Sequence, residues 1–185
     1  QLVFLRGNLM TGEQITRDLS KLSNPEKAKI LSRFFKTGKG QYGEGDIFLG
    51  IPVPQQRKVA KKYLNLSLID LQELLNSKIH EHRLTALLIL VAKYKKTDST
   101  GKKEIFNFYL NNTKNINNWD LVDLSAPKIV GDYLLDKNSS ILSELAKSKN
   151  LWERRIAILS TFEFIKHNNF NYAFSVFASD MNCGV

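Results

Sequence analysis

The chain contains 185 residues, of which 43% are hydrophobic, enough for the core of one ordinary domain or of one array of repeats. The single cysteine, Cys183, excludes an internal disulfide framework and a cysteine-rich zinc site. No apolar run reaches about 18 residues, which excludes a transmembrane helix. We therefore expect a cytoplasmic protein without membrane contact. The formal net charge of +9 favours a polyanionic partner, although a basic soluble protein that binds none has the same composition.

The first third of the chain predicts a helix followed by a glycine-rich loop. The segment Asn24–Glu26 (Asn-Pro-Glu) is a good helix start, with an N-capping side chain, a proline at the first helical position and an acid in the first turn. We expect this helix to run to about Lys36. Four of the residues from 37 to 46 are glycines, which predicts a loop. Lys39 is not followed by Ser or Thr and no strand precedes it, so the loop does not match a phosphate-binding Walker sequence.

The next predicted helix begins near Pro54 and has a basic surface. It carries Arg57, Lys58 and Lys61 within five residues. A solvated basic face is the ordinary explanation of such a helix, and contact with the DNA backbone is the functional one. These three side chains are therefore candidate DNA-binding residues.

From residue 67 onward the sequence is repetitive. Ser77 and Arg83 recur as Ser148 and Arg154, both at an offset of 71 residues, and half that offset falls on a middle unit. A period in the high thirties, with two helices per unit, is typical of HEAT-like repeats. We predict an all-α fold: a right-handed superhelical solenoid of HEAT-like helix pairs with a concave groove. It would form a single domain over residues 1–185, a fragment whose C-terminal repeats are missing.

In this register the helices that line the groove are expected at about 81–95, 118–135 and 152–166. Their N-termini carry the residues singled out below and attract phosphate groups. Pro127 lies inside the middle helix and removes a backbone donor there, so it predicts a kink.

Trp119 and Asp123 are four residues apart, on one face of the middle helix and about one turn from each other. One interpretation is a core tryptophan with an aspartate that is paired to Lys or Arg or caps a neighbouring helix. The other is an aromatic wall beside a carboxylate that stabilises an oxocarbenium-like transition state, as in glycoside cleavage. Residue spacing alone favours the first.

Arg154 and Arg155 begin the last of these helices. Either one of them bridges to Glu153 or to a neighbouring helix, or they form a phosphate clamp, because guanidinium binds phosphate in a bidentate fork. His80 and His82 lie on opposite sides of their predicted helix, which argues against a metal pair. We expect neither a metal nor another cofactor.

Several segments, in the right order, resemble the AlkD-like DNA alkylation repair proteins, which are HEAT-like repeat DNA glycosylases. The matching segments are Asn24–Ala28, Phe48–Ile51 with Pro54 and Arg57, Trp119–Asp123, Pro127, Gly131–Asp132 and Trp152–Leu159. This resemblance implies hydrolysis of the N-glycosidic bond of cationic N3- and N7-alkylpurines in double-stranded DNA, in base excision repair. It also implies a monomer in the bacterial cytoplasm or nucleoid.

The resemblance assigns the catalytic carboxylate to Asp123, the lesion-side aromatic to Trp119 and a groove arginine to Arg155. It further implies that the duplex is held in the groove without a pocket for a flipped base. A second groove tryptophan is expected beyond residue 170, and none is present up to Val185. Phe34 stands where some relatives have tyrosine. A non-catalytic protein that binds damaged or branched DNA and, more distantly, a protein-binding scaffold stay open as alternatives.

Overall fold

The computed structural model describes residues 11–171, 173 and 176. Cys183 and most of the segment from Phe170 to Val185 lie outside the described residues. Within the described part the backbone is helical, with loops and one isolated β-bridge between Ile47 and Ile79. No helix there is both long and apolar enough to cross a membrane. The all-α prediction is confirmed.

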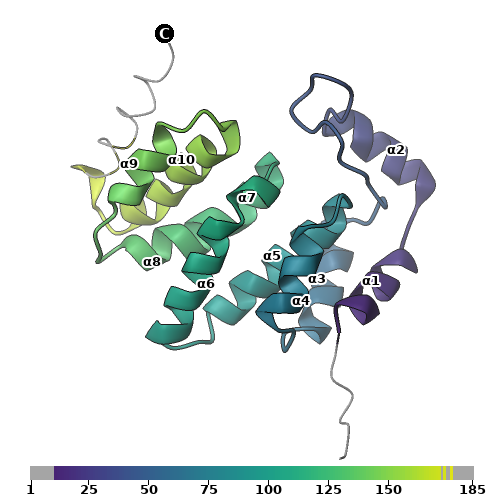
Figure 1. The fold of residues 1–185 in the computed structure, drawn as a ribbon, viewed down its shortest axis with the longest axis horizontal. Coiled ribbons are helices and arrows are strands. Elements are labelled where there is room, and N and C mark those ends of the chain that lie inside the picture. The colour runs from purple at the N-terminus through teal and green to yellow at the C-terminus, as the bar shows by residue number, and fades with distance from the viewer. Residues whose placement is uncertain (1–10, 172, 174–175, 177–185) are drawn as a thin grey trace, which may run out of the picture.

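Figure 1 shows the helices following one another across the molecule, from α1 and α2 at one side to α9 and α10 at the other. Their bounds are α1 Gly12–Ser20, α2 Pro25–Phe34, α3 Val53–Lys62, α4 Leu68–Leu75, α5 His80–Tyr94, α6 Ser99–Asn111, α7 Trp119–Ala126, α8 Asp132–Leu134, α9 Ser140–Ala146 and α10 Leu151–Lys166. A 3-10 turn (Thr113–Asn115) precedes α7, and a π-helical turn, η2 (Pro127–Gly131), separates α7 from α8.

Side-chain caps decide where the helices begin. The predicted cap of α2 is confirmed: the Asn24 Oδ1 atom accepts from the backbone N–H of Lys27 at 3.0 Å. The helix ends at Phe34, two residues earlier than expected. Asn118 caps α7 and Asn150 caps α10, each through its side-chain oxygen. These two caps fix the starts of the helices that carry the candidate site.

The two segments that match at an offset of 71 residues make the same contacts. Arg83 Nη1 donates to the carbonyl oxygen of Ser77 at 2.7 Å, and Arg154 Nη1 donates to that of Ser148 at 2.9 Å. In both, the serine hydroxyl also accepts from the backbone N–H two residues later, at 3.1 and 3.0 Å. The sequence match therefore corresponds to one local structure that occurs twice.

Contacts between neighbouring units have a regular sequence separation. The amide side chains of Gln72 and Asn112, 40 residues apart, exchange hydrogen bonds in both directions. Thr113 donates to Glu153 across the same separation. Glu153 thus accepts from Thr113 and from the Ser148 hydroxyl. The regular spacing agrees with the predicted period in the high thirties.

The buried core runs through α5, α7 and α10. α5 packs against α3, α4 and α7, and α10 packs against α7, η2 and α9. Leu87, Leu121 and Ile156, one from each of the three helices, are at most 1% exposed. These helices fall where groove-lining helices were predicted, at His80–Tyr94, at Trp119–Leu134 with an interruption, and at Leu151–Lys166.

The interruption lies at Pro127, as predicted, but it is a wide turn rather than a simple kink. The π-helical turn begins at the proline, which has no backbone N–H to donate. It ends at Gly131, where a Cβ atom would lie 2.5 Å from the carbonyl oxygen of Ser160 in α10. Glycine at this position lets η2 and α10 approach closely.

Candidate functional site

Asp123 of α7 and Arg155 of α10 form a bidentate ion pair. Oδ1 accepts from Nε and Oδ2 accepts from Nη2, both at 2.8 Å. The hydrogen bonds that Arg155 donates to Asp123 raise the pKa of Arg155. The structure therefore matches the interpretation in which Asp123 is paired. The partner of Asp123 is Arg155, the arginine that the sequence predicted to contact phosphate.

The pair lies at the surface. The side chains of Asp123 and Arg155 are 34% and 38% exposed. An exposed ion pair contributes only about 0.2–1 kcal/mol to stability, so the pair adds little to the fold. What it provides is an oriented carboxylate that solvent and ligands can reach.

Trp119 is held by aromatic side chains from the end of α2. Phe35 stacks on it with ring centroids 5.3 Å apart and an interplanar angle of 11°, and Phe34 meets it edge-on at 6.1 Å. Phe35 also stacks on Phe48 at 5.0 Å. Trp119, the predicted aromatic wall, is thus the last ring of a stack with Phe35 and Phe48. Phe34 contacts the edge of this stack at Trp119.

A buried charged network lies behind Trp119, and the sequence did not reveal it. His80 Nδ1 lies 3.1 Å from an Asp46 oxygen, and His80 Nε2 lies 2.8 Å from an Asp120 oxygen. Arg83 Nη2 donates to the other Asp46 oxygen at 2.6 Å, and Asn118 Nδ2 donates to Asp46 at 3.4 Å. Two carboxylates thus face two basic side chains, so the buried charges are compensated.

This network positions the start of α7. Asn118 and Asp120 flank Trp119 in sequence, and both side chains are anchored in it. The His80 ring also stacks on Phe48 at 4.6 Å and lies 5.1 Å from Phe35. The same aromatic stack therefore contacts both His80 and Trp119. His80 and Asp120 are 40 residues apart, a separation that the repeat period would have suggested.

His80 and His82 enter different environments, as their positions on opposite sides of the helix predicted. The His82 ring lies 3.1 Å from the Ser77 hydroxyl, away from the Asp46 network. Over residues 11–171, with 173 and 176, no group of three or more His, Cys, Asp or Glu side chains is placed to hold a metal ion.

The network predicts a pH-dependent stability. Burial lowers the pKa of His80, but the hydrogen bonds to Asp120 and Asp46 outweigh it, so the pKa lies above its ordinary value of 6.5. A raised histidine pKa contributes stability that is fully present below about pH 6.5 and is lost as the pH rises through the folded-state value. We expect the free energy of unfolding of the wild type, relative to His80→Gln, to fall as the pH rises above about 6.5.

The comparison with His80→Gln is needed because His82 acts in the opposite sense. Burial lowers the pKa of His82, so its contribution is lost as the pH falls below 6.5, in both proteins alike. Urea unfolding at a series of pH values measures the difference. A difference independent of pH would show that folding does not change the pKa of His80.

Arg154 and Arg155 border one cavity together with Trp119. This cavity has a volume of about 480 Å³ and is lined by Tyr42, Trp119, Leu151, Trp152, Arg154, Arg155, Ile158 and Leu159. Arg154 Nη1 donates to the carbonyl oxygens of Ser148 and Lys149, at 2.9 and 3.3 Å. Arg154 and Arg155, both predicted to bind DNA, therefore lie beside Trp119 of the predicted catalytic residues.

Arg57 and Lys58 are exposed on α3, and Arg57 belongs to a wider basic cluster. Burial lowers the pKa of Lys128 in η2, and the positive charges of Arg57, Lys95 and Lys166 lower it further. These four cations come from four elements: α3, η2, and the C-terminal ends of α5 and α10. No sequence motif marks Lys166 as a member of this basic cluster.

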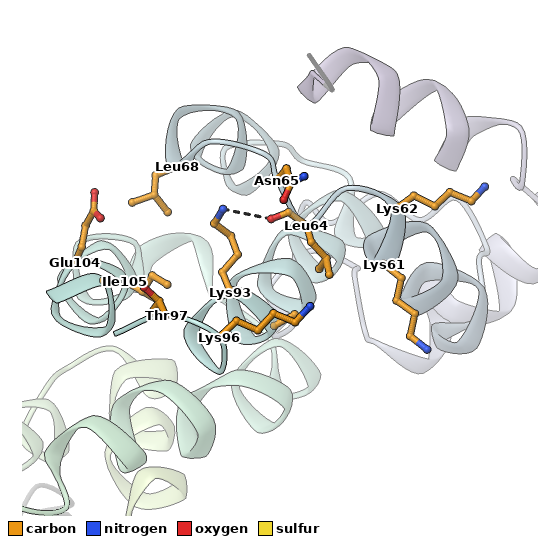
Figure 2. Close-up of a pocket in the computed structure, with 12 residues that line it drawn as sticks. Lys61, Lys62, Leu64, Asn65, Leu68, Lys93, Lys96, Thr97, Glu104 and Ile105 are labelled. Atoms are coloured by element: carbon orange, nitrogen blue, oxygen red, sulfur yellow. Dashed lines mark hydrogen bonds between the residues drawn. The ribbon is translucent and has the colours of Figure 1, made fainter. Parts of the chain in front are cut away.

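Lys61 lies apart from the Trp119 site. It lines a cavity of about 590 Å³ between the ends of α3 and α5 and the start of α6, together with Lys62, Lys93 and Lys96 (Figure 2). Lys93 Nζ is turned toward α3 and donates to the carbonyl oxygens of Leu64 and Leu66 at 3.3 and 2.9 Å. Trp119, Asp123 and Arg155 are not among the lining residues.

Comparison with known proteins gives a family match that spans most of the chain. A family model described as DNA alkylation repair enzyme matches residues 15–183, which include the ion pair, the aromatic stack and the buried network. A search of curated proteins found no match.

Proposed function

The chain belongs to the DNA alkylation repair enzyme family, and from this premise we propose that it is a DNA glycosylase that hydrolyses the N-glycosidic bond of cationic N3- and N7-alkylpurines in duplex DNA. The observation that carries the proposal is the surface-exposed, bidentate Asp123–Arg155 pair beside Trp119. An oriented anion next to a flat aromatic side chain matches the needs of that reaction.

The proposed reaction needs little acid catalysis. An alkylated purine already carries a positive charge, so it leaves as a neutral base, and the sugar is left with oxocarbenium character. A carboxylate near the sugar stabilises that developing charge and accepts a proton from the attacking water. Asp123 has this role in our proposal, and Arg155 holds it in position.

Trp119 and Arg155 would position the substrate. Trp119 would pack on the exposed sugar and backbone at the lesion, because Phe35 holds its ring from behind. Arg155 uses Nε and Nη2 for Asp123, so its Nη1 donors lie outside the pair and would bind a phosphate.

The wider surface would hold the duplex. We propose that the helix pairs form a HEAT-like solenoid whose groove receives double-stranded DNA, and that the protein acts as a monomer without a cofactor. The repeated turn contacts and the inter-unit bonds across 40 residues support this architecture. Arg154, Arg57, Lys58 and Lys61 would add backbone contacts.

The test is release of 7-methylguanine from methylated duplex DNA. We expect the protein to release the base faster than it is lost spontaneously from the same DNA without protein. Binding of the same DNA without release would favour the non-catalytic alternative, and the absence of both would favour a protein-binding scaffold.

Arg57 offers a separate test of the DNA contact. We expect Arg57→Ala to reduce the slope of log K against log salt by about 0.9, the value for one lost phosphate contact on B-DNA. The matched control is Arg17→Ala, which removes the same charge from an exposed arginine of α1 that is paired with Glu13. Equal slopes for the two variants would remove Arg57 from the interface.

A further inference from the structure

The His80 ring lies between two carboxylates that come from different segments. Its Nδ1 atom is 3.1 Å from an oxygen of Asp46, in the segment between α2 and α3, and its Nε2 atom is 2.8 Å from an oxygen of Asp120, in α7. An ionised carboxylate only accepts hydrogen bonds, whereas a neutral imidazole has one N–H to donate. Both contacts are therefore hydrogen bonds only when both ring nitrogens carry a proton.

The charges around the ring favour the same protonation state. Asp46, Asp120 and, from its own helix α5, Arg83 face His80. Burial raises the pKa of Asp46, but the hydrogen bond from His80 and the positive charge of Arg83 outweigh it, so this pKa lies below its ordinary value and the proton stays on the ring. The charges of these four side chains then balance.

Loss of one ring proton would break the contact to Asp120 rather than the contact to Asp46. Asp120 lies nearer the surface, since its side chain is 10% exposed and that of Asp46 is 3% exposed. It can turn toward water, whereas Asp46 stays between Arg83 Nη2 and the remaining ring N–H. The other oxygen of Asp120 accepts from the backbone N–H of Leu121, in its own helix, at 2.8 Å. The hydrogen bond from His80 thus ties Asp120 to α5.

Trp119 depends on His80 in two ways. It directly precedes Asp120 in the first turn of α7, so that side chain fixes the backbone that carries the indole ring. In addition, Phe35 stacks on Trp119 with ring centroids 5.3 Å apart and lies 5.1 Å from the His80 ring. A change at His80 therefore reaches Trp119 through the start of α7 and through the aromatic stack.

We propose that His80 is a positioning residue for base release: its doubly protonated ring holds Asp120 and thereby keeps Trp119 in place, and loss of one proton slows the reaction. The inference rests on the proposed function, in which Trp119 packs at the lesion. It gives base release an alkaline limit. Protonation of the Asp123 carboxylate would act in the opposite sense, slowing release as the pH falls.

The test is the rate constant for release of 7-methylguanine under single-turnover conditions, for the wild type and for His80→Gln. It is measured between about pH 6 and about pH 9, at a temperature where both proteins are folded. Glutamine is neutral throughout this interval. We expect the wild type to be faster by on the order of 10- to 100-fold at the lowest pH, and the ratio of the two rates to fall toward one as the pH rises. Titration of the substrate cancels in this ratio.

His167→Gln is the matched control, because it removes an exposed histidine that follows α10. Its rate relative to the wild type should be independent of pH. Asp120→Asn covers the case in which His80→Gln does not fold. The neutral amide no longer favours the charged form of the ring, so the fall in rate should move to a lower pH.

Fluorescence reports the environment of Trp119 without DNA. The chain has two tryptophans, so Trp152→Phe leaves Trp119 as the only one. Its emission should change over the pH interval in which the ratio of rates falls. This change should disappear when His80→Gln is added to Trp152→Phe.

A ratio of rates that does not vary with pH would overturn the proposal, as would emission from Trp119 that is constant over the same interval. Failure of the proposed function would look different, because neither the wild type nor any variant would then release 7-methylguanine. The emission of Trp119 needs no substrate, so it would still decide whether the proton on His80 positions this side chain.

Discussion

Replacement of Asp123 by asparagine should lower the release of 7-methylguanine by about 100- to 1,000-fold and leave the affinity for the methylated duplex unchanged. The magnitude is that of removing one electrostatic group aimed at a developing transition-state charge. Asparagine has nearly the same size and keeps one oxygen that accepts from Arg155, whereas its NH2 group cannot accept, so one of the two hydrogen bonds of the pair survives and the negative charge does not. The effect should therefore appear in the rate constant for release under single-turnover conditions.

The control is the same change at another partly exposed carboxylate. Asp132 accepts from the Tyr94 hydroxyl at 2.7 Å and from Lys102 at 3.1 Å, so Asp132→Asn also removes a paired charge. It should retain the wild-type rate of release. If Asp123→Asn releases the base as fast as the wild type, Asp123 has no catalytic role.

Asp46→Ala should destabilise the protein by about 3–5 kcal/mol, the cost of removing one partner from a buried ion pair. The side chains of Asp46, His80 and Arg83 are 3%, 2% and 5% exposed. Without Asp46, Arg83 loses its carboxylate and His80 keeps only Asp120. At this chain length the loss corresponds to a fall of roughly 6–20 °C in Tm. Calorimetry or urea unfolding measures it.

An exposed ion pair is the matched control. Arg17 and Glu13 in α1 are 73% and 80% exposed, so Glu13→Ala should change the free energy of unfolding by less than about 1 kcal/mol. Similar losses for Asp46→Ala and Glu13→Ala would show that the buried network does not stabilise the fold. Because the network anchors Asn118 and Asp120, Asp46→Ala should also slow release at temperatures where it remains folded.

The features predicted well are those encoded in short stretches of sequence. The Asn24 cap, the glycine-rich loop and the helix break at Pro127 each depend on residues within about one turn of each other. The pattern of matching residues at an offset of 71 likewise anticipated two segments with the same turn contacts. The placement of Trp119 and Asp123 one turn apart also follows from local helix geometry.

Short stretches of sequence could not predict which residues pair with those of the site. The sequence placed Arg155 near a phosphate and left open whether Asp123 is paired, whereas the structure joins the two across 32 residues. His80 was treated as an isolated histidine, yet its ring joins Asp46 and Asp120 from segments 34 and 40 residues away. Such contacts depend on how helices that are distant in sequence pack against one another.

By itself, then, the sequence determined the helical class, the start of α2, the likeness to a repair family and the two residues that we propose for the centre of the site. Only the tertiary structure decided that the carboxylate is held by Arg155, that a buried charged network supports Trp119, and that both tryptophans share one cavity. The physical reason is that caps, turns and helix periodicity act between residues close in the chain, whereas ion pairs, aromatic stacks and cavities form between segments that only packing brings together.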